Sequence, residues 1–186
     1  MKLYLSAGFL LLFSTLACTK QKQDDLVILT DTNGIVAPAV LFEYEYVNYA
    51  WNYQHNGWII DSHGMIHSFR QPKDWKYADS AGFISASDMY HNLKQTDSVT
   101  GRIDSATLYN KIKLIKPASQ GLITEKVNTA NDAGSAKLCA FIYDKSKDRY
   151  KEVFLAVSGD FTSVNTSKEA RELVEWLKHF GVLWIE

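Results

Sequence analysis

The architecture of this 186-residue chain follows from residues 40–51, which read Val40-Leu-Phe-Glu-Tyr-Glu-Tyr-Val-Asn-Tyr-Ala-Trp51. Aromatic side chains at positions 42, 44 and 46 alternate with glutamates at positions 43 and 45. This period of two predicts a half-buried β-strand with its aromatic side toward the core. A helix over the same residues is the weaker alternative, because aromatic side chains favour pleated sheets.

Two antiparallel hairpins are predicted around this strand. The first spans residues 57–69, where two β-rich runs flank the turn Asp61-Ser-His-Gly64 and the glycine can adopt the positive φ of a tight turn. The second joins residues 136–143 to residues 150–158 through a charged loop. Both hairpins fit a sheet that is largely antiparallel.

Three helices are predicted from capping patterns. The first covers residues 85–95 and the second begins at the N-cap Asp104 and ends before Pro117. The third begins at a capping box made by Thr166 and Glu169 and ends at Gly181. Residues 118–135 are expected to form a long loop with one short strand near position 122, and residues 182–185 a final strand or packed tail. The sum is an α+β fold in one compact domain, residues 26–186.

Composition excludes several classes of protein. Hydrophobic residues make up 46% of the chain and charged residues 22%, which excludes a disordered chain and a polytopic membrane protein. The formal net charge is -1, and such a balanced surface lacks the positive charge that holds a phosphate backbone. We therefore expect no nucleic-acid partner.

The amino-terminal residues have the features of a secretory leader. Met1 and Lys2 precede an uncharged, Leu-rich and Phe-rich stretch over residues 5–16, which is shorter than a membrane-spanning helix requires. Next comes Ser14-Thr-Leu-Ala-Cys18, which resembles the signal peptide of bacterial lipoproteins, although Thr15 stands where the usual motif has Leu. The resemblance implies a signal peptide over residues 1–17 and a lipidated tether over residues 18–25.

This resemblance also implies a cellular location. Lipid attachment at Cys18 would anchor the chain to a membrane of the cell envelope, because two or more acyl chains bind a bilayer stably. Thr19 after the cysteine resembles lipoproteins that reach the outer membrane, so we expect the outer rather than the inner membrane. A plain secretory leader with an incidental cysteine is the alternative.

Cys139 is the second cysteine of the chain. If Cys18 is acylated, Cys139 is a free thiol, and its apolar surroundings indicate a small buried side chain rather than a nucleophile. A disulfide between Cys18 and Cys139 is the alternative if the leader is not of the lipoprotein type.

Titratable residues give no complete catalytic motif. His55, His63 and His67 lie within thirteen residues, but His63 falls in the predicted turn and no metal-binding spacing accompanies them, so we expect no metal ion and no cofactor. There is no Gly-x-Ser-x-Gly motif. Scattered carboxylates and histidines could still meet in the fold and support an envelope hydrolase, which predicts a pocket where His55 or His67 meets Asp or Glu. The candidate carboxylates are Glu43, Glu45, Asp61 and Asp160. Because the sequence holds no complete catalytic motif, we favour a non-enzymatic protein and keep an enzyme as the alternative.

Six Tyr and Trp residues lie between positions 44 and 58. Such side chains suit a glycan or a protein ligand, although packing in the core of a sheet is the simpler interpretation. The candidate ligand-binding residues are Trp51, Tyr53, His55 and Trp58. Beyond the leader, the blocks at residues 48–57 and 60–64 and the closing residues 158–160, 165–170 and 176–177 resemble small bacterial lipoproteins, a likeness that implies no particular activity. We therefore expect an envelope-anchored binding protein, with an envelope hydrolase as the alternative.

Overall fold

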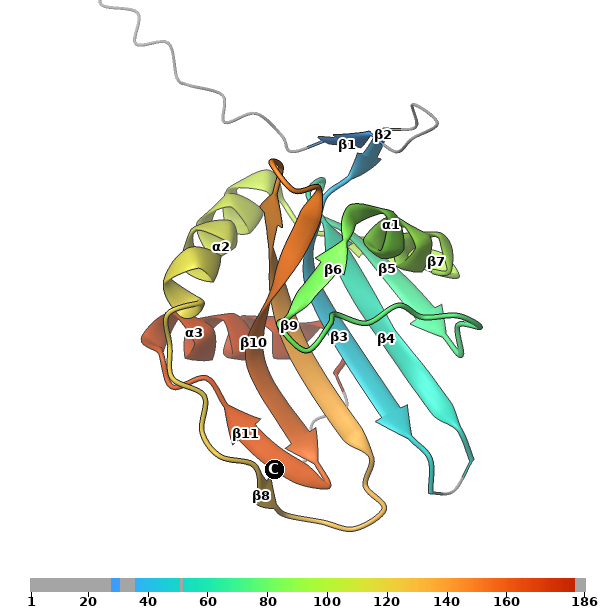
Figure 1. Ribbon diagram of the computed structural model, residues 1–186, viewed down its shortest axis with the longest axis vertical. Coiled ribbons are helices and arrows are strands. Elements are labelled where there is room, and N and C mark those ends of the chain that lie inside the picture. Colours follow the sequence, from blue (N-terminus) through green and yellow to red (C-terminus); the bar gives the residue numbers. More distant parts are fainter. Residues whose placement is uncertain (1–27, 31–35, 51, 183–186) are drawn as a thin grey trace, which may run out of the picture.

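The computed structural model describes residues 28–30, 36–50 and 52–182. They form one compact α+β domain whose main sheet has nine strands, all of them paired antiparallel (Figure 1). The predicted fold class is confirmed. The helices lie on both faces of this sheet, so its central strands are covered on two sides.

The strands of the main sheet run in the spatial order β7-β5-β4-β3-β9-β10-β11-β8, and β6 pairs with one end of β10. Their bounds are β3 Val40–Asn48, β4 Gln54–Asp61, β5 Met65–Arg70, β6 Phe83–Ser85, β7 Ser98–Arg102, β8 Val127–Asn128, β9 Ser135–Asp144, β10 Arg149–Gly159 and β11 Phe161–Val164. A separate pair is formed by β1 Ile28–Thr30 and β2 Val36–Pro38. Both predicted hairpins are present, as β4–β5 and β9–β10.

The two faces of the sheet have different coverings. Helices α2 (Ser105–Ala118) and α3 (Lys168–Leu177) pack on one face, over the aromatic side of β3. Helix α1 (Ala86–Lys94) packs on the opposite face, together with Trp75 from the segment between β5 and β6. Cys139 lies buried on this second face and is a free thiol among the described residues, in agreement with the prediction that it packs in the core.

Strand β3 is more deeply buried than its sequence suggests. Phe42, Tyr44 and Tyr46 face the core under α2 and α3, as expected. Glu43 and Glu45 on the other side are also buried, because the segment after β5 covers them. The prediction of a half-buried strand was therefore wrong for the acidic side.

Helix ends differ from the prediction at two positions. Pro117 lies inside the last turn of α2 rather than beyond it, where a missing backbone N–H costs only one hydrogen bond near the helix end. The N-cap of α3 is Ser167, whose hydroxyl accepts from Ala170 N at 3.1 Å. Thr166 instead donates its hydroxyl proton to Leu122 O. Gly181 adopts a left-handed conformation after a short 3-10 helix (Lys178–Phe180) that extends α3, as a C-terminal glycine should.

Two further predictions concern less regular parts of the chain. The loop after α2 contains β8 and an isolated bridge between Ile123 and Asn165, close to the predicted short strand. The predicted final strand lies almost wholly outside the described residues, as does the leader with Cys18. None of the helices in the described part of the chain is long and apolar enough to cross a membrane.

Candidate functional site

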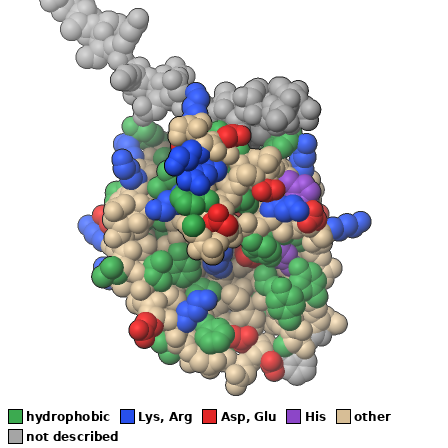
Figure 2. All heavy atoms as spheres, viewed as in Figure 1, with side chains coloured by type: hydrophobic (Ala, Val, Ile, Leu, Met, Phe, Trp, Pro, Cys, Tyr) green, Lys and Arg blue, Asp and Glu red, His purple; other side chains and the backbone are tan. Residues whose placement is uncertain are grey.

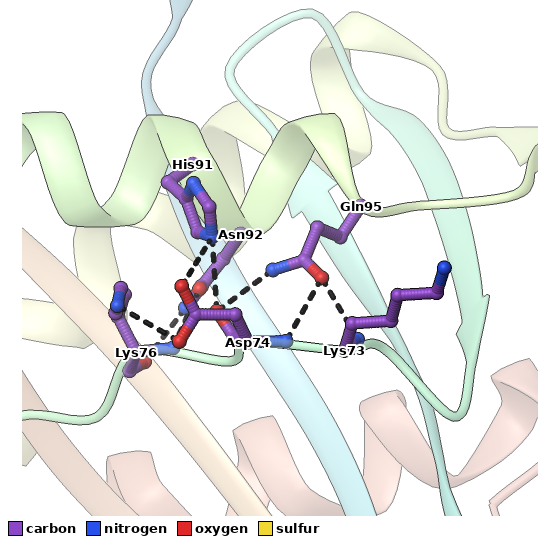
Figure 3. A network of polar contacts seen from close by, with 6 residues as sticks. All are labelled: Lys73, Asp74, Lys76, His91, Asn92 and Gln95. Atoms are coloured by element: carbon purple, nitrogen blue, oxygen red, sulfur yellow. Dashed lines mark hydrogen bonds and ion pairs between the residues drawn. The ribbon is translucent and has the colours of Figure 1, made fainter.

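A segment without regular structure, residues 71–82, crosses the face of the sheet that carries α1, and side chains of α1 hold it in place (Figure 3). The side-chain amide of Asn92 makes the two hydrogen bonds that a neighbouring strand would make with Lys76. It accepts from Lys76 N at 2.8 Å and donates to Lys76 O at 2.7 Å. Gln95 accepts from the backbone N–H of Lys73 and Asp74 and donates to Asp74 O. These contacts satisfy backbone groups that would otherwise have no partner in a sheet. They place Trp75 and Tyr77, two residues apart, over the sheet.

Beneath this segment, β3 and β4 bring together three buried titratable side chains. Glu43 and Glu45 lie on the same side of β3, and His55 lies on β4 beside Glu45. His55 Nε2 is 2.7 Å from Glu45 Oε1. Both atoms are buried without an aligned hydrogen bond, so their attraction is mainly one of charge and dipole. Burying such groups disfavours folding unless they are well paired, which makes this cluster a candidate functional site.

Glu43 is the most perturbed acid of the cluster. Burial, with the negative charge of Glu45 as the second cause, raises the pKa of Glu43 to about 8. The indole N–H of Trp75 donates to its carboxyl group, and the positive charge of Lys137 also acts in the opposite direction. Glu43 is therefore predominantly protonated at neutral pH while it lies next to a second glutamate.

An ion pair on the two neighbouring strands, Lys137 with Glu152, lies next to this acid–histidine cluster. Lys137 pairs in register with Glu45 on the neighbouring strand, and its ammonium lies 3.1–3.2 Å from both carboxylate oxygens of Glu152. Cys139, two residues along the same strand, lies under α1, and burial raises the pKa of its thiol. The thiol is therefore neutral and is not a candidate nucleophile.

Three exposed tyrosine side chains lie next to this buried cluster near the β3–β4 turn. Tyr49, Tyr53 and Tyr77 are 75%, 44% and 55% exposed. Figure 2 shows hydrophobic side chains gathered next to a histidine on this face of the molecule. The hydroxyl of Tyr53 is 3.2 Å from His55 Nδ1, and the hydroxyl of Tyr77 donates to Glu45. The polar ends of these two tyrosines are thus held by buried groups, whereas their rings remain accessible.

His55 is enclosed by aromatic rings. Its ring lies edge-on to Phe69 and Trp75 at centroid distances of 5.4 and 5.6 Å, and parallel to Tyr77 at 6.4 Å. Gly57 makes this packing possible, because a Cβ atom there would overlap the backbone oxygen of Tyr44 and lie 2.6 Å from Phe69 Cζ. We use the name tyrosine site for the whole arrangement, formed by Glu43, Glu45, Tyr49, Tyr53, His55, Trp75 and Tyr77.

The four residues predicted to bind a ligand do not lie together. Tyr53 and His55 belong to the tyrosine site. Trp58 is buried on the opposite face of the sheet, against Tyr44 and Phe180, because residues 55 and 58 of one strand point to opposite sides. Trp51 lies outside the described residues.

The other candidate acids and histidines take structural positions. Asp61 accepts from the backbone of His63 and Met65 in the β4–β5 turn and contacts His67 Nε2 at 2.8 Å. Asp160 accepts from the backbone N–H of Ala133 and is not part of the tyrosine site. Within the described ranges, no three His, Cys, Asp or Glu side chains gather closely enough to hold a metal ion.

Trp75 and Tyr77 were missed by the sequence analysis. They lie in a segment without periodic pattern, and only the side chains of α1 fix their position over the sheet. The recurrence of Trp and Tyr two residues apart is the one signal that could have indicated them.

No known protein family, curated protein or solved structure matches this chain. The fold and the site alone define its class: an α+β protein that carries a buried acid–histidine cluster under an exposed rim of tyrosines.

Proposed function

We propose that this chain is a lipoprotein of the bacterial cell envelope, anchored through Cys18 in the outer membrane, whose domain binds a glycan at the tyrosine site. The lipoprotein-like leader supports the anchor. The tyrosine site supports the binding activity.

One observation carries the proposal for binding: Tyr53 and Tyr77 are about half exposed, yet their hydroxyl groups are held by His55 and Glu45. A side chain that is fixed before binding loses little entropy when a ligand arrives. The backbone of Tyr53 is also fixed, because the side-chain amide of Gln71 donates to Tyr53 O at 2.8 Å. The site therefore offers rigid flat rings at low entropic cost.

A glycan suits these rings better than a protein ligand does. Sugars present faces of C–H groups that pack on aromatic rings, and hydroxyl groups that bind carboxylates and tyrosine hydroxyls. The exposed rings of Tyr49 and Tyr53 lie 5.3 Å apart and form one small platform. A platform of this size suits one or two sugar rings, whereas a stable protein interface requires about 800 Å² on each partner.

A glycan-binding measurement tests the proposal. The full-length chain in detergent is screened against an array of bacterial and host oligosaccharides, and hits are titrated by calorimetry. The double variant Tyr53→Ala with Tyr77→Ala is expected to lose at least about tenfold in affinity, since each ring contributes on the order of 1 kcal/mol. Tyr109→Ala is the matched control, because Tyr109 is 46% exposed but lies on α2. Equal losses in both variants, or no hit on the array, would contradict the proposal.

The anchor is tested separately. Mass spectrometry of the protein extracted from membranes is expected to show Cys18 at the amino terminus with acyl chains attached. The Cys18→Ala variant should then appear in the soluble fraction. An unmodified Cys18 in the mature protein would reject the lipoprotein assignment without affecting the glycan-binding test.

A further inference from the structure

Tyr53, His55 and Glu45 lie in one line of polar contacts from the surface to the interior. The hydroxyl of Tyr53 is 3.2 Å from His55 Nδ1, and His55 Nε2 is 2.7 Å from Glu45 Oε1. The negative charge of Glu45 favours the proton of the neutral imidazole on Nε2, although the two groups are not aligned as a hydrogen bond, and this leaves Nδ1 as an acceptor. In this tautomer the Tyr53 hydroxyl donates to a base, and a carboxylate lies against the far side of that base.

The three side chains become more buried from the reacting hydroxyl to the base and the carboxylate. Tyr53 is 44% exposed, whereas His55 is 1% and Glu45 is 6% exposed. The rings of Phe69, Trp75 and Tyr77 pack against the imidazole, while its Nδ1 faces Tyr53 at the exposed end of the line. A charge that develops on His55 is consequently stabilised by Glu45 in a medium of low dielectric constant, where such interactions are strong.

Tyr53 is the hydroxyl group best suited to this role. Tyr53 is the hydroxyl that lies at His55 Nδ1, whereas the hydroxyl of Tyr77 donates to Glu45. Burial, then the nearby Tyr49 and Glu45, raises the pKa of Tyr53, so its hydroxyl keeps its proton at neutral pH and the proton must pass to His55 as the oxygen attacks.

We infer that Tyr53, His55 and Glu45 form a catalytic relay for acyl transfer, and that the substrate class is a carboxylic ester carried by the bound ligand, such as an O-acylated sugar. The sugar part of this substrate rests on the proposed function, whereas the relay does not. The relay is a specific form of the envelope hydrolase alternative, in which His55 meets Glu45.

The reaction proceeds in two steps that need no co-reactant other than water. The Tyr53 oxygen bonds to the ester carbonyl carbon, its proton moves to His55 Nδ1, and the bond to the leaving alkoxide breaks as that oxygen takes the proton from His55. Water then attacks the acyl-tyrosine, His55 accepts the proton of water, and the acid is released as the proton returns to Tyr53. Glu45 is a positioning residue, because in this reaction it acts through the imidazole and does not touch the ester.

Tyrosine reactivity tests the relay without knowledge of the natural ester. The full-length chain is treated with an aryl sulfonyl fluoride, and the rate of labelling at each tyrosine is followed by peptide mass spectrometry. We expect Tyr53 to react at least about tenfold faster than Tyr109, which is similarly exposed but has Lys113 Nζ over its ring instead of a histidine at its hydroxyl. The His55→Gln variant should reduce labelling of Tyr53 to the Tyr109 rate. Equal rates at the two tyrosines in the unmodified protein would overturn the relay.

Ester hydrolysis supplies the second measurement, with p-nitrophenyl acetate as the probe. Tyr53→Phe is expected to lower the rate at least about tenfold, and Tyr109→Phe to leave it unchanged. Glu45→Gln should lower the rate of hydrolysis and shift the pH at which the rate changes. The titratable groups that face His55 are Glu45, Tyr53 and Tyr77. A Tyr53→Phe variant that keeps the full rate overturns the inference. Neither the labelling nor the hydrolysis assay contains a glycan, so failure of the relay and failure of the glycan-binding proposal give different results.

Discussion

The Glu43→Gln substitution is expected to make the protein more stable at alkaline pH. Glu43 is buried beside Glu45, and burial raises its pKa to about 8 from the ordinary value of 4.5. Between these two pH values the folded protein keeps the proton that the unfolded chain has released. The unfolded state then binds fewer protons, so the free energy of unfolding falls as pH rises from about 4.5 to about 8 and is level outside that window.

The magnitude follows from the width of this window. A separation of one pH unit between the folded and unfolded pKa is worth about 1.4 kcal/mol, which sets an upper limit of roughly 5 kcal/mol. We expect about 2–4 kcal/mol, because neighbouring dipoles such as the Trp75 indole relax toward the ionised carboxylate. Glutamine has nearly the same shape and no charge, so the variant should escape this loss.

Urea unfolding followed by tryptophan fluorescence measures the effect at pH 5, 7 and 9. The variant and the unmodified protein are expected to be similar at pH 5 and to diverge progressively up to pH 9. Glu125→Gln is the matched control, because Glu125 is exposed and its variant should follow the unmodified protein. Parallel curves for the Glu43→Gln and unmodified proteins would refute the assignment of a protonated Glu43.

Three further substitutions test the structure around the site by urea unfolding. Asn92→Ala removes both amide contacts with the crossing segment and should cost about 2–3 kcal/mol and red-shift the tryptophan emission; an unshifted spectrum would contradict the role assigned to Asn92. Gly57→Ala should cost about 2–4 kcal/mol, because the new methyl group overlaps the backbone oxygen of Tyr44 and the ring of Phe69, and a loss under about 0.5 kcal/mol would contradict this close packing. Asp61→Ala should cost about 2–4 kcal/mol, since two turn N–H groups and His67 lose their acceptor, with binding at the tyrosine site unchanged.

Local patterns predicted much of the fold. The turn before β5, the hairpin β9–β10 and the N-caps Ser85 and Asp104 depend on residues close in sequence, and all are present. The boundaries that differ, at Pro117 and Ser167, depend on contacts made after the helices pack. The order of the strands in the sheet had no local signal.

The site was harder to predict, because it depends on which residues cover the sheet. Alternation along β3 correctly separated the aromatic from the acidic side chains, yet it did not show that Glu43 and Glu45 are buried. Their burial comes from Trp75 and Tyr77, which lie some thirty residues away in a segment without pattern. The same alternation explains why Trp58 and His55 lie on opposite faces.

The most direct test of the central claim is nuclear magnetic resonance mapping of a glycan that binds the full-length chain in detergent. Chemical-shift changes are expected at the backbone amides of Tyr53 and His55 and at the indole N–H of Trp75, which donates to Glu43 beneath the tyrosine rim. Shifts confined to the edge formed by β8 and β11, with Trp75 unaffected, would contradict the claim that the tyrosine site binds the ligand.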